Sequence, residues 1–349
     1  MQYLRTILKF NVKRRNPFSK PKIPIYLQLY RLANLPWKRY LRILIGLPLG
    51  QVWKPIFRLG RASRGSFVYD NRTVFFRAGN TQFASVYFDM FRDGFEAEVA
   101  TVIDLLTNDN SVFFDIGANW GHHSLYLASK PGFKGKIVAF EPVPDTFEDL
   151  VSVVDQTALH SVIQCKQIAL SDKSGTLNMS FPDAISSGMA RLDPNGKGPL
   201  VQMDALDHLK LGVDPDVIKL DAEGEEANIL RGASQLIRRC KPMIIFESFR
   251  EVDNASAALE RFRLLADLGY TFFQTVFVRN ENGNEYAIQI VWEDALSSSP
   301  NQTFGLYEFD WEERFLFGGS NFLACHKDRI PELMNLASKP CARNRAAAS

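Results

Sequence analysis

The sequence predicts an α/β fold in which helices cover both faces of a doubly wound, mostly parallel sheet. Short apolar runs typical of buried strands alternate with segments of helical spacing along most of the chain. The runs at residues 112–115, 136–140, 217–220 and 243–246 each end in or next to an acidic residue. Ligands bind at the carboxyl ends of parallel strands, so we expect the ligand site at this edge of the sheet.

The other elements follow from the same patterns. A strand pair is expected over residues 67–78, before the first of these strands, and a helix over residues 95–106. The later elements are predicted as a helix at 151–154, strands at 162–169 and 176–181, and helices at 225–238 and 255–268, the last closed by Gly269.

A glycine-bracketed turn follows the strand that is predicted to end in Asp115. Gly117 and Gly121 allow backbone conformations that bring a ligand close to the main chain and to the amides of a helix predicted over residues 122–130. The spacing is Gly-x-x-x-Gly and differs from the dinucleotide fingerprint Gly-x-Gly-x-x-Gly. The turn therefore favours a nucleotide-like ligand without indicating phosphate binding.

The strand at residues 136–140 ends in Glu141-Pro142, about twenty residues beyond the turn, as in ribose-binding βαβ units. A carboxylate there can accept hydrogen bonds from both hydroxyls of a ribose. Pro142 has no amide hydrogen and ends the strand. The alternative is an ordinary solvated acid at a strand end.

Further motifs occur together in a fixed order. They are Phe114-Asp115-Ile116-Gly117-Ala118-Asn119-Trp120-Gly121, Ala139-Phe140-Glu141-Pro142, Asp204-Ala205-Leu206, Ile218-Lys219-Leu220-Asp221-Ala222-Glu223-Gly224-Glu225, Leu230-Arg231-Gly232-Ala233 and Pro242-Met243-Ile244-Ile245-Phe246-Glu247. Over roughly residues 95–250 the chain thereby resembles the FkbM family of S-adenosylmethionine-dependent methyltransferases. His122-His123 departs from the family, which more often has aromatic or apolar residues there.

The resemblance implies a class I methyltransferase fold, which is Rossmann-like, with S-adenosylmethionine as cofactor. It also implies O-methylation of a sugar or another hydroxyl-bearing product. The expected cofactor-binding residues are Asp115, Gly117, Asn119, Gly121, Glu141 and Pro142. No metal ligand is predicted, because the acidic residues lack a compact ligand spacing, and the metal requirement is left open.

Methyl transfer to a hydroxyl needs in-line positioning and removal of the hydroxyl proton. The catalytic candidates are Asp221, Glu223 and Lys219. Lys219 shares a strand face with Asp221 and is expected to pair with it, which would lower the pKa of the aspartate. An ion-paired strand end without a catalytic role is the alternative.

Acceptor-binding candidates are His122, His123 and Glu247, although polar residues at a helix start are more often solvent-facing. Residues 183–198 are polar and glycine-rich, so they are expected to form either a lid or an ordinary surface loop. Residues 307–317 are rich in aromatics, which either stack on a sugar ring or belong to the core.

Charge divides the chain unevenly. Residues 1–64 contain 15 Lys or Arg and no Asp or Glu, whereas the remaining 285 residues hold 26 basic and 39 acidic residues. Basic clusters interleaved with aromatics suit an anionic membrane surface, and a merely solvated arm is the alternative. Nucleic acid is not expected as a partner, because no DNA- or RNA-reading motif is present.

Residues 1–66 are thus expected to form a basic extension, residues 67–336 the methyltransferase domain and residues 337–349 a disordered tail. The four cysteines show no close pair, which favours a reducing compartment. The apolar stretch at residues 41–49 is too short to span a bilayer, and no signal peptide is recognisable. We expect a cytoplasmic enzyme with peripheral membrane contact.

The expected activity is O-methylation of a sugar hydroxyl in a glycan or glycoconjugate. Two alternatives remain: methylation of a small secondary metabolite, and a non-catalytic ligand-binding scaffold of the same fold. Asp115 and Glu141 together argue against the scaffold.

Overall fold

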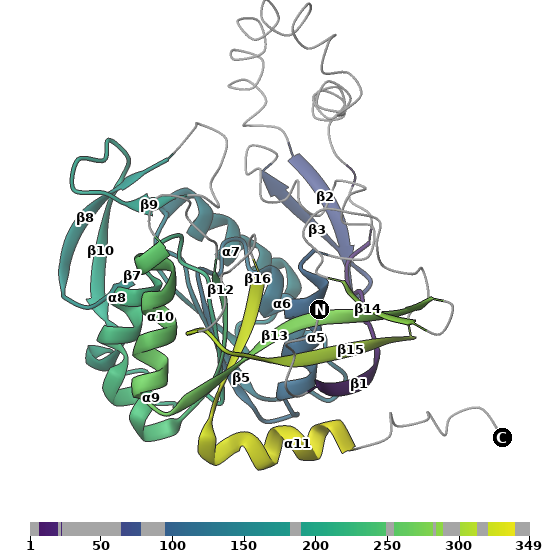
Figure 1. Ribbon diagram of the computed structural model, residues 1–349. Helices are drawn as coiled ribbons and strands as arrows, with labels where there is room; N and C mark the ends of the chain where they lie inside the picture. Colours follow the sequence, from purple (N-terminus) through teal and green to yellow (C-terminus); the bar gives the residue numbers. More distant parts are fainter. Residues whose placement is uncertain are drawn as a thin grey trace, which may run out of the picture.

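A computed structural model describes residues 7–19, 22, 64–77, 95–181, 190–248, 255–281, 284–288, 301–312 and 320–338 (Figure 1). Its centre is a ten-stranded mixed sheet. The parallel half consists of β6 (Ile163–Lys166), β5 (Lys136–Phe140), β4 (Val112–Ile116), β11 (Val217–Leu220) and β12 (Met243–Ser248), paired in that order. The chain runs outward from β4 to β6 and then crosses to β11. The switch point of the sheet therefore lies between β4 and β11.

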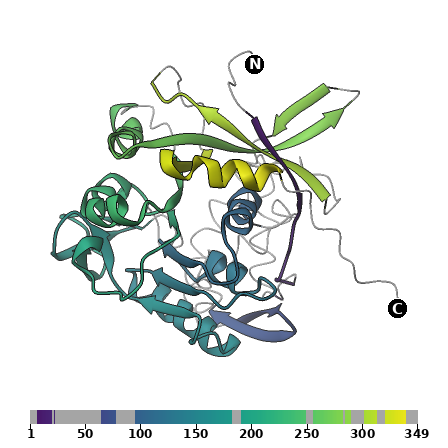
Figure 2. The same ribbon diagram turned by 90° about the horizontal axis from the view of Figure 1, so that it is seen from below.

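The antiparallel half continues from β12. It consists of β16 (Ser320–His326), β13 (Tyr270–Glu281), β15 (Asn301–Phe309) and β1 (Ile7–Lys13), with β14 (Asn284–Ile288) paired to β13. Figure 2 shows β13, β14 and β15 lying together on one side of the molecule. The predicted α/β sheet is confirmed, and its parallel part is the half that carries the acidic strand ends.

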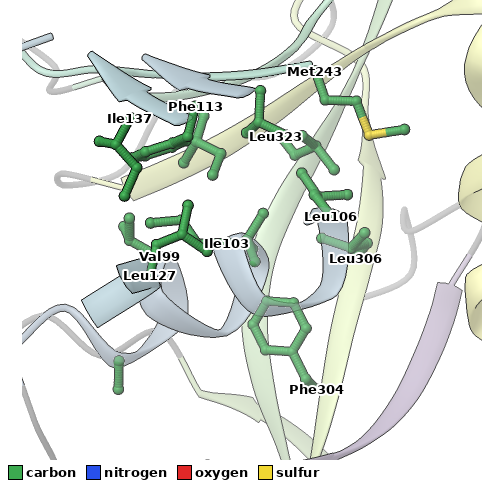
Figure 3. Close-up of a cluster of buried hydrophobic side chains, with 14 of the residues drawn as sticks. Val99, Ile103, Leu106, Phe113, Leu127, Ile137, Met243, Phe304, Leu306 and Leu323 are labelled. Carbon is green, nitrogen blue, oxygen red and sulfur yellow. The ribbon is translucent and has the colours of Figure 1, made fainter. Parts of the chain in front are cut away.

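Helices cover both faces of the sheet. They are α5 (Ala97–Leu106), α6 (His122–Ala128), α7 (Pro144–Thr157), α8 (Glu226–Gly232), α9 (Ser234–Cys240), α10 (Ala255–Asp267) and α11 (Ile330–Ser338). Phe113 packs with Val99 and Ile103 of α5 on one face (Figure 3), whereas its neighbour Phe114 packs with Ile229 and Phe262 on the other. Successive strand residues point to opposite faces, so both clusters draw on the same strands.

One predicted helix is wrong in extent. Residues 225–238 form α8 and α9, which meet at Ala233 with φ −111° and ψ 8°. Gly232 lies so close to β7 (Ala169–Ser171) that a Cβ there would overlap the carbonyl oxygen of Ser171. This tight contact holds the chain at the break between the two helices.

A small second sheet is inserted between β6 and β11. It contains β7, β10 (Leu200–Ala205), β8 (Gly175–Ser180) and β9 (Arg191–Leu192) in that order. Met179, Val201 and Met203 form its own apolar cluster. Residues 182–189, the first half of the predicted lid, lie outside the described residues.

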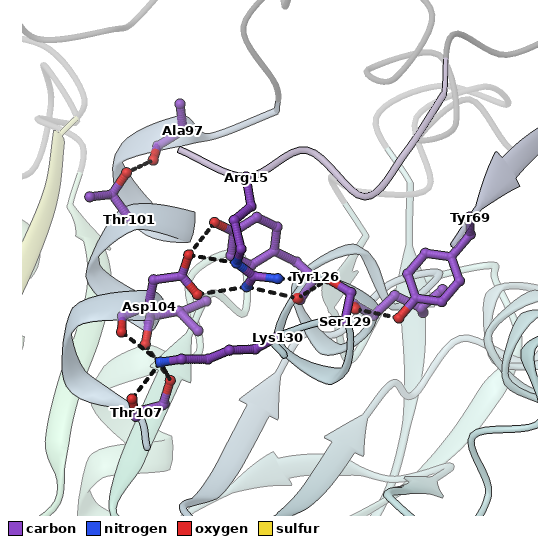
Figure 4. A network of polar contacts seen from close by, with 11 residues as sticks. Arg15, Tyr69, Ala97, Thr101, Asp104, Thr107, Tyr126, Ser129 and Lys130 are labelled. Atoms are coloured by element: carbon purple, nitrogen blue, oxygen red, sulfur yellow. Dashed lines mark hydrogen bonds and ion pairs between the residues drawn. The ribbon is translucent and has the colours of Figure 1, made fainter. Parts of the chain in front are cut away.

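The N-terminal segment joins the main sheet where it is described. β1 pairs with β15, and Phe18 forms a bridge to Tyr69 in the hairpin of β2 (Arg64–Tyr69) and β3 (Arg72–Arg77). Arg15 reaches Asp104 of α5 and Tyr126 of α6 (Figure 4). Residues 7–19 are thus joined to the fold, and the boundary predicted at residue 66 remains a prediction.

Two other expectations concern the chain ends and the membrane. α11 extends to Ser338, and residues 339–349 of the predicted tail lie outside the described residues. None of the described helices is long and apolar enough to span a membrane. In residues 307–317, Tyr307 and Phe309 are buried in the core, and residues 313–317 lie outside the described residues.

Candidate active site

A cavity of about 230 Å³ opens at the carboxyl ends of β4, β5, β11 and β12. Strand register explains which residues reach it. Ile116, Leu220 and Phe246 are aligned across the sheet, and Phe140 pairs with Ile116. The next residue of each strand or turn lies one level higher and lines the cavity: Gly117, Asp221, Glu247 and Glu141.

Gly117 holds the turn after β4 against β11. Its φ is +73°, and a Cβ at this position would overlap the backbone oxygen of Asp221. The amides of Gly117 and Ala118 both donate to the carbonyl oxygen of Phe140, at 3.1 and 2.9 Å. Only glycine permits this approach, so the turn is fixed between the ends of β5 and β11.

Glu141 joins two backbone turns and faces the cavity. The amide of Asn119 donates to its Oε2 at 3.0 Å, and the amide of Val143 donates to its Oε1 at 2.8 Å. Burial raises the pKa of Glu141 to about 7. A carboxylate has about four acceptor sites, so capacity remains for hydroxyls of a ligand. Pro142, Asn119 and Gly117 line the cavity with it, and Gly121 begins helix α6 beneath the turn.

Asp115 lies behind the cavity wall. Its side chain is fully buried, accepts a hydrogen bond from Ser124 Oγ at 2.6 Å, and has Oδ1 3.7 Å from the Nζ of Lys219. Asp115 and Lys219 are register partners one level below the cavity. The structure therefore supports a role for Asp115 in placing Lys219, and a direct cofactor contact stays a prediction.

Lys219 pairs with Asp221 as expected. Its Nζ is 3.1 Å from Asp221 Oδ2 and donates to the carbonyl oxygen of Gly117 at 3.1 Å. Lys219 lowers the pKa of Asp221, as expected, but the net shift is upward. Burial raises that pKa and outweighs Lys219, and the charge of Glu96 raises it further.

Two further acids stand near Asp221. Burial and the charge of Asp221 raise the pKa of Glu223 to about 7. Burial and the charges of Asp221, Glu96 and Glu223 raise the pKa of Glu247 to about 9. The nearest described cation to Glu223 is Arg191, at 4.0 Å. The negative charges of these acids therefore repel one another.

The two histidines are buried, contrary to the solvent-facing position typical of a helix start. His122 stacks on Phe18 with ring centroids 4.8 Å apart, and burial lowers its pKa well below the ordinary value. His123 Nε2 lies 2.8 Å from Glu96 Oε2. Burial opposes ionisation of Glu96, but the bond to His123 leaves its pKa lowered. Both histidines line the cavity.

The sequence patterns did not identify Glu96 as a site residue. It directly precedes α5, lines the cavity and has a left-handed φ of 45°. Asn119 and Glu223 also line the cavity with positive φ, at 51° and 46°. Non-glycine residues held in this region cluster at functional sites. Met179 and Leu192 of the inserted sheet complete the wall, and only the tertiary fold brings them there.

Within the described residues, no group of three or more His, Cys, Asp or Glu side chains is arranged to hold a metal ion.

Comparison with known proteins agrees with the family resemblance. Residues 115–272 match the methyltransferase FkbM domain, which confirms the predicted family. The chain is 26% identical over 152 residues to the hexuronic acid methyltransferase AglP of Haloferax volcanii. That alignment covers 43% of this chain and 61% of the length of the curated relative.

Solved methyltransferase structures are more distant. A methyltransferase FkbM from Methylobacillus flagellatus is 18% identical with a TM-score of 0.35, over 57% of this chain and 44% of that one. An S-adenosylmethionine-dependent O-methyltransferase from Thermotoga maritima is 12% identical with a TM-score of 0.32, over 62% and 65%. At these scores the likeness carries no argument, and the fold assignment rests on strand order and register.

Proposed function

We propose that this chain, whose residues 115–272 belong to the FkbM methyltransferase family, is an S-adenosylmethionine-dependent O-methyltransferase. One observation carries the proposal: a glycine turn, a ribose-competent glutamate and a group of acids meet in one cavity at the switch point of the sheet. Support comes from two parts of the cavity. The donor half is the part that can bind S-adenosylmethionine, and the proton half is the part that can accept the proton of the acceptor hydroxyl.

The donor half is formed by the turn after β4 and by Glu141. Gly117 lets the turn pack against the backbone of Asp221 at the cavity wall, and Glu141 keeps acceptor capacity for the ribose hydroxyls beside its two amide bonds. The sulfonium of the donor is a cation, and the acids around Asp221 supply the opposite charge.

The proton half favours Glu223. Asp221 is held by Lys219, whereas Glu223 has a pKa of about 7, the range in which a general base works best near neutral pH. In the proposed step the acceptor oxygen attacks the methyl carbon and the carbon–sulfur bond breaks. Its electron pair goes to sulfur, and the hydroxyl proton goes to the Glu223 carboxylate. Asp221 and Lys219 position the reacting groups.

The acceptor is proposed to be a sugar hydroxyl. The relative from Haloferax volcanii is named for a hexuronic acid, and it aligns with 152 residues of this chain. The buried pair His123 and Glu96 adds polar groups to the wall on which such an acceptor would lie.

Calorimetric titration with S-adenosylmethionine, with NAD as control ligand, tests the donor. We expect saturable binding that Glu141→Gln weakens about ten- to a hundredfold, because a charged hydrogen bond contributes roughly 1.5–3 kcal/mol. Glu223→Gln is expected to retain donor affinity and to lose turnover in a labelled-methyl assay. Absence of donor binding by a folded protein would favour the scaffold alternative.

For the basic N-terminal segment we propose contact with an anionic membrane surface. Support comes from its 15 basic residues without any acid. Arg15 is paired with Asp104 and Arg14 lies over the ring of Phe277, so the proposal concerns mainly residues 23–63. A variant with these residues replaced by a short neutral linker, and residues 1–22 kept, should lose salt-sensitive sedimentation with phosphatidylserine vesicles. Retained sedimentation would refute membrane contact through this segment.

A further inference from the structure

The described wall of the cavity has a strong excess of acidic side chains. It contains Glu96, Glu141, Asp221, Glu223, Glu225 and Glu247, whereas Lys219 is its one Lys or Arg within the described residues. Lys219 is only 5% exposed and is engaged by Asp221 and by the carbonyl oxygen of Gly117. Among the described lining residues, no Lys or Arg is therefore free to pair with an anionic ligand, and Arg191, which borders the lining, faces Glu223 at 4.0 Å.

Two of these acids accept hydrogen bonds that hold the local backbone or neighbouring side chains. Glu141 accepts the amides of Asn119 and Val143, and Glu225 accepts hydrogen bonds from Ser171 Oγ at 3.2 Å and Asn228 Nδ2 at 2.9 Å. The other four form one electrostatic group, because the charge of one raises the pKa of another.

We refer to Glu96, Asp221, Glu223 and Glu247 as the acceptor acids. Glu96 and Glu223 are both held in a left-handed backbone conformation that glutamate rarely adopts. Glu96 is tied to His123 at 2.8 Å, and Asp221 to Lys219 at 3.1 Å, so both carboxylates are fixed in place. Burial and the negative charges of the other three acceptor acids raise the pKa of Glu247. The fold therefore gathers four acidic side chains in the wall of one cavity.

We propose that the acceptor acids select an uncharged or positively charged sugar, such as a neutral hexose or an amino sugar, and reject a sugar that carries a carboxylate. The inference rests on the proposed methyl transfer. Hydroxyl and ammonium groups donate hydrogen bonds to carboxylates, so they satisfy these acids. A carboxylate acceptor would lose its hydration without gaining a partner cation. The chain would then differ in acceptor charge from the relative named for a hexuronic acid.

Matched probes of equal shape test the charge preference. Methyl glucosiduronic acid and its uronamide differ only in charge, and their binding to the full chain is measured by saturation-transfer NMR with S-adenosylhomocysteine present. We expect the uronamide to bind at least tenfold more tightly. Equal signals from the two probes, whether strong or absent, or tighter binding of the acid, would overturn the proposal.

A variant and its control locate the effect. Glu96→Gln, which removes a carboxylate that His123 keeps ionised, should reduce the difference in affinity between the two probes, whereas Glu312→Gln, which removes an exposed acid outside the cavity lining, should leave that difference unchanged. Calorimetry with S-adenosylmethionine on the same samples separates the two claims. Donor binding with a preference for the acid retains the proposed function and refutes the inference. Absent donor binding together with tighter binding of the uronamide refutes the proposed function and retains the charge preference.

Discussion

Arg15 anchors the N-terminal strand to the domain, and replacing it tests whether this segment is part of the fold. Its Nε and Nη2 donate to both oxygens of Asp104 at 3.0 and 2.6 Å, and Nη1 donates to Ser129 Oγ at 2.9 Å. The guanidinium also lies 4.4 Å from the centre of the Tyr126 ring (Figure 4). Arg15→Met keeps the apolar stem and removes every donor.

The expected loss follows from burial. Breaking a buried ion pair costs about 3–5 kcal/mol and an exposed pair about 0–1 kcal/mol. The Arg15 and Asp104 side chains are 23% and 21% exposed, and Asp104 keeps a hydrogen bond from the Tyr126 hydroxyl at 2.7 Å. We therefore expect Arg15→Met to lower the free energy of unfolding by about 2–3 kcal/mol.

Urea unfolding followed by circular dichroism measures this change. Lys13→Met is the matched control, because Lys13 is exposed at the end of β1, two residues before Arg15, and its replacement should change stability by less than about 0.5 kcal/mol. A double-mutant cycle with Asp104→Asn should return a coupling of about 1–2 kcal/mol. If Arg15→Met matches Lys13→Met, the anchoring argument fails and residues 7–19 behave as a separate arm.

Three further predictions concern the cavity. Gly117→Ala should weaken S-adenosylmethionine binding at least tenfold by calorimetry, because its Cβ would overlap the Asp221 carbonyl and its φ is +73°; wild-type affinity would contradict the role of the turn. The pKa of Glu247 is raised from 4.5 to about 9 in the fold, so its protonation favours folding, and this advantage is lost as pH rises from about 4.5 through 9. Glu247→Gln should thus stabilise the ligand-free protein by about 1–2 kcal/mol at pH 8 and leave it unchanged at pH 4, whereas an equal effect at both pH values in urea titrations would exclude this linkage. Phe18→Ala should cost about 3 kcal/mol and weaken donor binding, since Phe18 contacts Trp120 and His122 behind the turn; loss of stability with intact donor affinity would make its role purely structural.

The strands of the parallel half could be predicted closely from the sequence. The ranges predicted for β5 and β11 coincide with those observed, and the strand predicted to end in Asp115 falls one residue short of β4, because strands buried on both faces read as continuous apolar runs that end at glycine or an acid. The antiparallel half was not predictable in this way. β1 pairs with β15 almost the whole length of the chain away, and no local pattern specifies such a partner. The burial of His122 likewise depends on Phe18, which reaches it only through that pairing.

The placement of the acids shows what a sequence pattern can and cannot resolve. Counting residues from the strand ends puts Asp115 one position too early: it is followed by Ile116, which still belongs to β4. Asp221 and Glu141 follow the last residue of their strands, and Glu247 stands level with Asp221, because Phe246 is paired with Leu220. A shift of one position along a strand changes both the height and the direction of a side chain. Asp221, Glu141 and Glu247 therefore line the cavity, whereas Asp115 is buried behind its wall with Oδ1 3.7 Å from the Nζ of Lys219. Parallel register can be anticipated from motif spacing, whereas the acid contributed by Glu96 enters from a helix outside the strand pattern and requires the folded chain.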